Sequence, residues 1–355
     1  MTSRFDQVQK AAAEQSDVVG LAGGLPANEL LPREGLARAL AEVATLNESA
    51  LQYGWPEGAP ELRAWVARRL TARGATIDPE RVIITAGAQQ ALVIAASCLG
   101  AREIEVGDAT YQGALQAFGT RAVPRSADVR YVIAGVTNPQ GTPQLPASQL
   151  LASARELIVD EAYTELRFDG RVLSPIVADA PDRVWHIGTV SKTIAPGLRV
   201  GWLIPPRAHH AAALERKHAA DLQTASVSQL ALARMFGLVD YDAIVATARC
   251  AYAARAAALS TALHRHARDL PFTEPAGAFS IWIDTGERGT CDDELALLEA
   301  ALAEGVMVDP GSLFRPTPID TIAVRLCYSN APVESFDEGV RRLSRALARW
   351  RRQAA

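Results

Sequence analysis

One lysine follows an apolar stretch and has phosphate-binding side chains around it. Lys192 comes shortly after residues 184–187 (VWHI), and its polar neighbours along the chain are Thr189, Ser191 and Arg199. A desolvated lysine amine can form an imine with an aldehyde. Hydroxyl and guanidinium groups suit a phosphate. The segment therefore predicts a site for a phosphate-bearing aldehyde, and the alternative is a solvated turn with an ordinary lysine.

A carboxylate and a phenol follow a second apolar stretch. Asp160 and Tyr163, in the sequence DEAY, come directly after residues 156–159. Beside a heteroaromatic cofactor, the carboxylate raises the pKa of a pyridine nitrogen and keeps it protonated. The phenol can donate a hydrogen bond to an oxyanion on the ring. The pair is common by itself and gains meaning only beside such a cofactor.

Two further segments have ligand-binding features. Residues 138–141 (NPQG) follow another strand-like stretch and could equally be a β-turn chosen for its Asn, Pro and Gly. In residues 85–90 (TAGAQQ), a strand passes through Gly87 into a helix. Glycine permits close approach of the backbone, and the free N–H groups of a helix N-terminus attract anions. Residues 85–90 therefore predict an anion site.

The elements that must position these groups alternate between strand and helix. Most of the predicted strands are continuous apolar runs, typical of a parallel sheet covered on both faces. They are Arg81–Ala86, Glu103–Val106, Val129–Ala134, Glu156–Val159, Val184–Ile187 and Val200–Ile204. Helical stretches lie between several of them, and residues 208–263 read as long helices interrupted near 237–242. We therefore expect a doubly wound, mainly parallel α/β sheet, whose ligands bind at the carboxyl ends of its strands.

The chain divides by pattern into three parts. Residues 1–44 are predicted to be an N-terminal segment that packs with the small domain and the pocket. Residues 45–245 are expected to form the large, ligand-binding α/β domain. Residues 246–355, with short strands set among helices, are expected to form a smaller α+β domain.

With these motifs, the chain resembles the fold type I pyridoxal-5′-phosphate aminotransferases of class I/II, and most of all the subgroup that contains 2-aminoadipate aminotransferase. The resemblance covers nearly the whole chain in nine ordered motifs. They are AGGLP (22–26), LQYGWPEGAPELR (51–63), TAGAQQAL (85–92), NPQG (138–141), DEAY (160–163), SKTIAPGLRVGW (191–202), PAGAFSIW (275–282), GVMVDPGSLF (305–314) and RLCYSN (325–330).

The resemblance implies a role for each matching residue around the cofactor. Lys192 would bind the cofactor aldehyde and later move the substrate Cα proton. Asp160 would pair with the pyridine nitrogen, while Tyr163 and Asn138 would hold the ring oxygen. The residues implied to stack on the ring or to bind its phosphate are Tyr111, Ala88, Gln89, Thr189, Ser191 and Arg199, with Tyr53 reaching the phosphate from a neighbouring subunit. The expected assembly is therefore a homodimer.

The resemblance also implies a substrate site. Arg325 matches the arginine that binds the substrate α-carboxylate, and Asn138 and Gly24 would line the same pocket. No second arginine is placed by a motif, although Arg4 and Arg315 are candidates. We therefore expect an amino donor with a neutral or apolar side chain.

The expected activity is transfer of an amino group between an amino acid and a 2-oxo acid by a ping-pong mechanism. A lyase, decarboxylase or synthase reaction on the same cofactor is the first alternative. A non-catalytic sensor, like the effector domains of certain transcription regulators in this subgroup, is the second.

Three features depart from the family pattern. A helix is missing from the crossover between Tyr111 and Asn138, and the crossover from Asn138 to Asp160 is short. Ala278 stands where the family usually has a second glycine.

Composition excludes several other classes of protein. The 355 residues carry 36 basic and 40 acidic side chains, a net charge of −4, which does not suit a nucleic-acid partner. Apolar runs such as Ala91–Ala96 fall far short of the ~20 residues of a membrane helix. Four separated cysteines and two close histidine pairs predict no disulfide and no metal site. The polar N-terminus lacks a signal-peptide pattern, and we expect a cytoplasmic enzyme.

Overall fold

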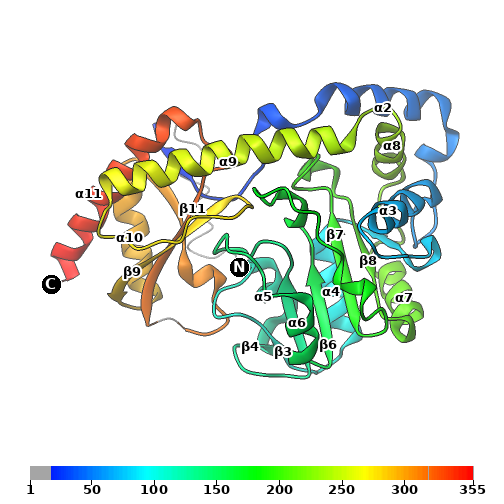
Figure 1. The fold of residues 1–355 in the computed structure, drawn as a ribbon, viewed down its shortest axis with the longest axis horizontal. Coiled ribbons are helices and arrows are strands. Elements are labelled where there is room, and N and C mark those ends of the chain that lie inside the picture. Colours follow the sequence, from blue (N-terminus) through cyan, green and yellow to red (C-terminus); the bar gives the residue numbers. More distant parts are fainter. Residues whose placement is uncertain (1–16, 319, 355) are drawn as a thin grey trace.

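The computed structural model describes residues 17–318 and 320–354 and contains two sheets (Figure 1). The larger sheet has seven strands. Their spatial order is β2 (Ile83–Thr85), β8 (Gly201–Ile204), β7 (Val184–Thr189), β6 (Glu156–Asp160), β5 (Val129–Ile133), β3 (Ile104–Glu105) and β4 (Ala122–Val123). Only β8 runs antiparallel to its neighbours β2 and β7. The mainly parallel sheet predicted from the sequence is therefore confirmed.

Helices cover both faces of this sheet. Successive strand residues point to opposite sides, and apolar side chains on both sides are buried against the helices. In β5, Tyr131 and Ile133 pack with one apolar cluster and Val132 packs with the other. The first cluster contains residues of α4 (Ala88–Cys98) and α5 (Gln112–Phe118). The second contains residues of α3 (Pro60–Ala72), α6 (Ala147–Ser153) and α8 (Ser226–Phe236). This arrangement makes the fold doubly wound.

The smaller sheet joins the two ends of the described chain. Its order is β1 (Val19–Leu21), β10 (Val306–Pro310), β11 (Thr321–Cys327) and β9 (Ser280–Arg288). β1 pairs parallel with β10, and the other pairings are antiparallel. Helices α10 (Cys291–Ala303) and α11 (Phe336–Ala354) pack with this sheet, so the predicted small α+β part is confirmed.

A single long helix, α9 (Tyr241–His266), extends along both halves of the molecule (Figure 1). Position 245, the predicted limit of the large domain, lies inside this helix, and the division at that position stays a prediction. The N-terminal segment contributes β1 to the small sheet, while α2 (Arg33–Leu46) packs against α8. Residues 1–16 of the predicted N-terminal segment, including Arg4, lie outside the described residues.

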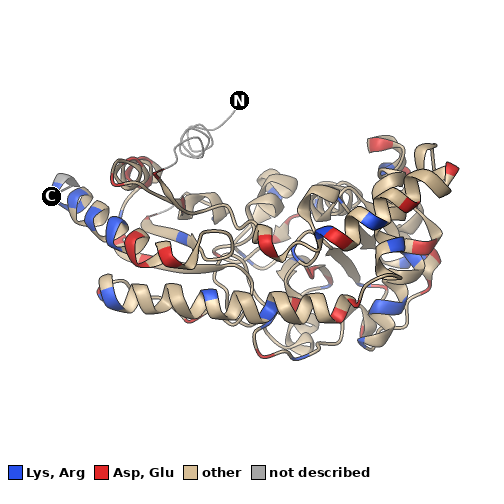
Figure 2. Ribbon diagram, turned by 90° about the horizontal axis from the view of Figure 1, so that it is seen from above, with Lys and Arg blue, Asp and Glu red and all other residues tan. Residues whose placement is uncertain are grey.

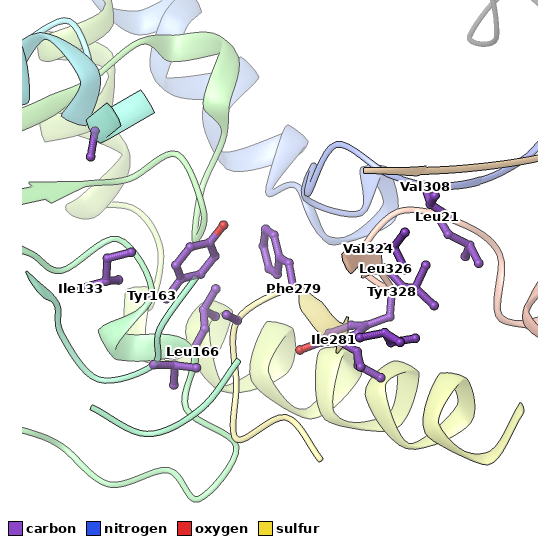
Figure 3. Packing of buried hydrophobic residues seen from close by; sticks show 14 of the residues in the cluster. Leu21, Ile133, Tyr163, Leu166, Phe279, Ile281, Val308, Val324, Leu326 and Tyr328 are labelled. Carbon is purple, nitrogen blue, oxygen red and sulfur yellow. The ribbon is translucent and has the colours of Figure 1, made fainter. Parts of the chain in front are cut away.

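The apolar core continues from the large sheet into the small one. Tyr163, after β6, meets Phe279, just before β9, with ring centroids 5.3 Å apart in an edge-to-face arrangement (Figure 3). Ile133 lies on one side of this contact, and Leu326 and Val308 lie on the other. Because one core spans both sheets, residues from the small sheet can hold fixed positions beside the large one.

Between Tyr111 and Asn138 the structure has one α-helix, α5, and the shortening of the two crossovers relative to the family stays a prediction. Only five residues connect β4 to β5, and they contain no helix. The crossover from β5 to β6 contains only α6, which has seven residues. The helical stretch 208–263 has one more break than expected, because Leu222 adopts a left-handed conformation (φ 60°) and ends α7 (His210–Asp221).

Charged residues of both signs are distributed over the helices of both halves (Figure 2). On α11, for example, Arg342 pairs with Glu338 one turn earlier. Within the described part of the chain, no helix is long and apolar enough to cross a membrane.

Candidate active site

The carboxyl ends of β5, β6 and β7 open into one pocket. Of the eleven residues predicted to bind the cofactor, ten line it: Ala88, Gln89, Tyr111, Asn138, Asp160, Tyr163, Thr189, Ser191, Lys192 and Arg199. They come from six segments of the chain and meet because parallel strands bring their carboxyl ends to one edge of the sheet. Ile133, Ala162 and Pro196 also line the pocket and were not predicted.

Lys192 presents its amine at the centre of this group. Its Nζ donates a hydrogen bond to the Gly24 carbonyl oxygen at 3.3 Å. It also lies 5.7 Å from the ring centroid of Tyr163 and 5.6 Å from that of Phe279. Burial, reinforced by the positive charge of Arg325, lowers the pKa of Lys192 to about 8. At pH 7 about a tenth of this amine is therefore deprotonated, far more than for a lysine with the ordinary pKa.

Asp160 ends β6 with its carboxylate buried. It accepts hydrogen bonds from the Ala162 backbone N–H and the Tyr131 hydroxyl, both at 3.0 Å. Burial raises the pKa of Asp160, although these two donors act in the opposite direction. Both of these donors are neutral, so a protonated ring nitrogen would be the first charged hydrogen-bond partner of this carboxylate. Sequence reasoning missed Tyr131, whose only signal was its place three residues before the end of the predicted strand Val129–Ala134.

The N-terminus of α4 forms one end of the pocket, where free backbone N–H groups would suit an anion. Gly87 has φ 83° there, and a Cβ atom at this position would lie 2.5 Å from Arg199 Nη2. Glycine is thus required for the close approach of the guanidinium, which also donates to the Ala86 carbonyl oxygen at 3.1 Å. Ser191 completes this end, and its backbone N–H donates to Thr189 Oγ1 at 3.1 Å.

Two phenols flank the space between these groups. Tyr111 immediately precedes α5, and Tyr163 lies three residues after Asp160. Burial raises the pKa of both hydroxyls, so both are protonated donors at neutral pH. Asn138 lies beside them at the end of the segment that follows β5.

Arg325 and Gly24 lie next to the pocket rather than in its wall. Arg325 Nη1 donates to Asn138 Oδ1 at 3.1 Å. Gly24 lies between Lys192 and Arg325. Its carbonyl oxygen accepts a hydrogen bond from Lys192, and a Cβ atom at this position would lie 3.6 Å from Arg325 Nη2. The guanidinium is paired with Asp309, a buried residue that sequence reasoning did not single out. Only its place in GVMVDPGSLF could have drawn attention to it.

Tyr53 is not brought to this pocket within one chain. Its side chain is 79% exposed and lines a separate concavity together with Trp55 and Gln223. Within the described residues, no group of histidine, cysteine or acidic side chains has the arrangement of a metal site.

The residues in the pocket fit pyridoxal 5′-phosphate. The α4 N-terminus, the hydroxyls and Arg199 are donors suited to a phosphate dianion. Asp160 is an acceptor suited to a protonated pyridine nitrogen, and Lys192 has an amine suited to an aldehyde.

Known proteins of one family resemble this chain along most of its length. The family model described as aminotransferase class I and II matches residues 120–343. A 2-aminoadipate transaminase from Thermus thermophilus is 30% identical, with 94% of this chain and 91% of that protein covered. An aromatic-amino-acid aminotransferase from Thermococcus litoralis is 31% identical over 94% of this chain and 89% of its own.

A solved structure agrees with these matches. An α-aminoadipate aminotransferase from Thermus thermophilus, complexed with N-(5′-phosphopyridoxyl)-L-leucine, superimposes with a TM-score of 0.85. It is 27% identical, and the match covers 98% of this chain and 95% of that structure. The chain therefore belongs to the class I and II aminotransferases, and it is a fold type I enzyme that uses pyridoxal 5′-phosphate to transfer an amino group between an amino acid and a 2-oxo acid.

Proposed function

We propose that the ten pocket residues bind the cofactor and that Lys192 is the catalytic base. The observation that carries this proposal is the lysine amine, with a pKa of about 8, in the same pocket as a buried carboxylate and an anion-binding helix N-terminus. When bound there, pyridoxal phosphate supplies the aldehyde and the electron-withdrawing ring that amino-group transfer needs.

Each protein group then has a distinct task. Asp160, supported by Tyr131, keeps a proton on the ring nitrogen. Tyr163 and Asn138 donate to the ring oxygen, and Tyr111 packs on the ring face. Lys192 Nζ would accept the proton from the substrate Cα and donate it to the carbon that was the aldehyde carbon of the cofactor, while the Gly24 carbonyl orients the amine.

The phosphate end is completed from a second subunit in this proposal. Tyr53 is exposed on a segment that also exposes Leu51 (75%) and Trp55 (74%), an apolar surface suited to a partner chain. We propose a homodimer in which Tyr53 reaches the phosphate of the neighbouring site. The cytoplasmic location stays a prediction from the sequence.

We propose that the amino donor has a neutral or apolar side chain and that 2-oxoglutarate serves as a general acceptor. Arg315, the described candidate for a second carboxylate-binding arginine, donates instead to Thr321 Oγ1 at 2.9 Å and lies over Trp282. Its guanidinium is therefore engaged within the small sheet.

The test is a panel of amino acids added singly to the purified holoenzyme. Loss of the visible absorbance of the bound cofactor reports the first half-reaction, and addition of a 2-oxo acid should restore it. Release of ammonia or carbon dioxide without this reversal would indicate a lyase or a decarboxylase instead. Absence of any spectral change across the panel would indicate a non-catalytic sensor. Lys192→Ala is the negative control for the spectral change.

A further inference from the structure

Arg325 already has a carboxylate partner within the protein. We propose that Asp309 is a specificity-determining residue that weakens binding of a substrate carboxylate at Arg325 and so admits amino donors that lack the α-carboxylate. This inference rests on the proposed role of Arg325 as the carboxylate-binding group. It makes primary amines, in addition to amino acids, the substrate class of the enzyme.

The two side chains form a close pair away from solvent. Asp309 Oδ2 accepts hydrogen bonds from Arg325 Nη2 at 2.7 Å and from Arg325 Nε at 3.0 Å. The exposed fractions of the two residues are 3% and 8%. The Phe314 ring covers the guanidinium, with its centroid 4.4 Å from Cζ. In this buried environment the two charges interact strongly. The positive charge of the guanidinium is therefore balanced by the Asp309 carboxylate before a substrate binds.

The backbone fixes this pair in place. Asp309 and Arg325 are directly opposite each other on the antiparallel strands β10 and β11. The Gly23 backbone N–H donates to both carboxylate oxygens of Asp309, at 3.2 and 3.0 Å. Cys327, also on β11, places its sulfur 3.6 Å from Asp309 Oδ2. Asp309 therefore cannot turn away when a second anion approaches, because two neighbouring segments, the one at Gly23 and strand β11, hold its carboxylate.

The open side of the guanidinium faces Gly24. The positions of Nη1 and Nη2 are 3.7 and 3.6 Å from where a Cβ of residue 24 would be, so the glycine places no side-chain atom in the space beside these two nitrogens. A carboxylate in this space would share one guanidinium with Asp309. Two like charges at one buried site oppose each other. A donor without a carboxylate avoids this repulsion. The reactivity of an amine relative to that of its parent amino acid should therefore be higher than it would be without Asp309.

The experiment compares matched donors on the wild-type holoenzyme and on Asp309→Asn. Three pairs differ only in the α-carboxylate: L-alanine and ethylamine, L-leucine and 3-methylbutylamine, and L-phenylalanine and 2-phenylethylamine. The rate of loss of cofactor absorbance, divided by the apparent dissociation constant, gives a selectivity ratio for each pair. In addition, calorimetry measures binding of propanoate, a carboxylate without an amine, to each holoenzyme.

Glu294→Gln is the matched control. Glu294 is also a buried carboxylate held by the small sheet, where it accepts from the Ser312 and Ala323 backbone N–H groups at 2.8 and 3.1 Å. The control should keep the wild-type ratio and propanoate affinity. Asp309→Ser, which leaves room for water at the guanidinium, is the second variant if Asp309→Asn does not fold.

For the donor pair that reacts fastest with the wild type, we expect the selectivity ratio to favour the amino acid over its amine by less than a hundredfold. We expect Asp309→Asn to shift that ratio toward the amino acid by at least tenfold and to bind propanoate at least tenfold more tightly. An unchanged or weaker propanoate affinity in the folded variants overturns the inference. A wild-type preference for the amino acid above a hundredfold overturns it as well, and this measurement needs no variant.

Failure of the proposed function gives a different result. In that case no donor changes the cofactor absorbance in the wild type. The propanoate measurement still decides whether Asp309 weakens carboxylate binding at Arg325.

Discussion

Tyr131 donates a hydrogen bond to Asp160 Oδ2 at 3.0 Å from the neighbouring strand, and both residues are buried. The strands β5 and β6 pair in parallel, with Ile133 opposite Asp160. The tyrosine therefore reaches forward along the sheet to support the carboxylate that we assign to the ring nitrogen.

Tyr131→Phe should weaken the cofactor site. Loss of a hydrogen bond to a charged group costs about 1.5–3 kcal/mol. We therefore expect the dissociation constant for pyridoxamine phosphate to rise by about tenfold or more, with a parallel loss in kcat. Tyr252→Phe is the control, because the buried Tyr252 hydroxyl accepts a hydrogen bond from the Ala27 backbone N–H and has no hydrogen bond to Asp160. Equal cofactor affinities in the wild type and Tyr131→Phe would contradict the assigned support.

The pKa of Lys192 should leave a signature in the stability of the cofactor-free protein. Burial lowers this pKa from 10.5 to about 8, so between these values the unfolded chain binds more protons than the folded chain. Stability must then rise with pH across this window, by roughly 3 kcal/mol for one group. Urea unfolding of wild type and Lys192→Met at pH 7.5 and pH 10.5 measures the difference. The free energy of unfolding of the wild type minus that of Lys192→Met should be larger at pH 10.5 than at pH 7.5. No increase in this difference would show that the amine is not buried as described.

Mixed dimers should reveal whether Tyr53 acts across the subunit interface. We expect Tyr53→Phe and Lys192→Ala homodimers to have low activity. In a mixed dimer, one site would combine the intact Lys192 of one subunit with the intact Tyr53 of the other. Refolding the two variants together should then restore about a quarter of wild-type activity, since about half of the dimers are mixed and each has one intact site. Activity no higher than that of the better parent would place both residues in the same chain.

Ala278 should tolerate glycine unusually well. It adopts φ 64° and is 1% exposed, so its methyl group is buried in a conformation that L-residues disfavour. Relief of roughly 1–2 kcal/mol of strain should offset the lost methyl burial and the added chain entropy of Ala278→Gly. We expect the free energy of unfolding to stay within about 0.5 kcal/mol of wild type. Ala323→Gly, at a buried strand position without positive φ, should cost about 1–2 kcal/mol. Equal losses in the two variants would argue against strain at position 278.

The sequence alone indicated the part of the site that follows strands. Asn138, Asp160 and Lys192 each come shortly after an apolar run, and parallel strands place such residues at one edge of the sheet. The helix N-terminus at Ala88 was equally visible, because a strand, a glycine and a helix follow one another within six residues. These features are local in the chain, and their meeting follows from the class of fold.

The tertiary structure alone decided the partners of these residues. Tyr131 and Asp309 lie within strands, where an apolar pattern hides a polar side chain, and their roles depend on the register with the neighbouring strand of the sheet. The positive φ of Ala278 likewise appears only once the backbone is placed. The position of a residue along the chain therefore predicts which groups lie at the edge of the large sheet. The pairing of strands determines which charged groups already have an ion-pair partner in the protein, as Arg325 has in Asp309.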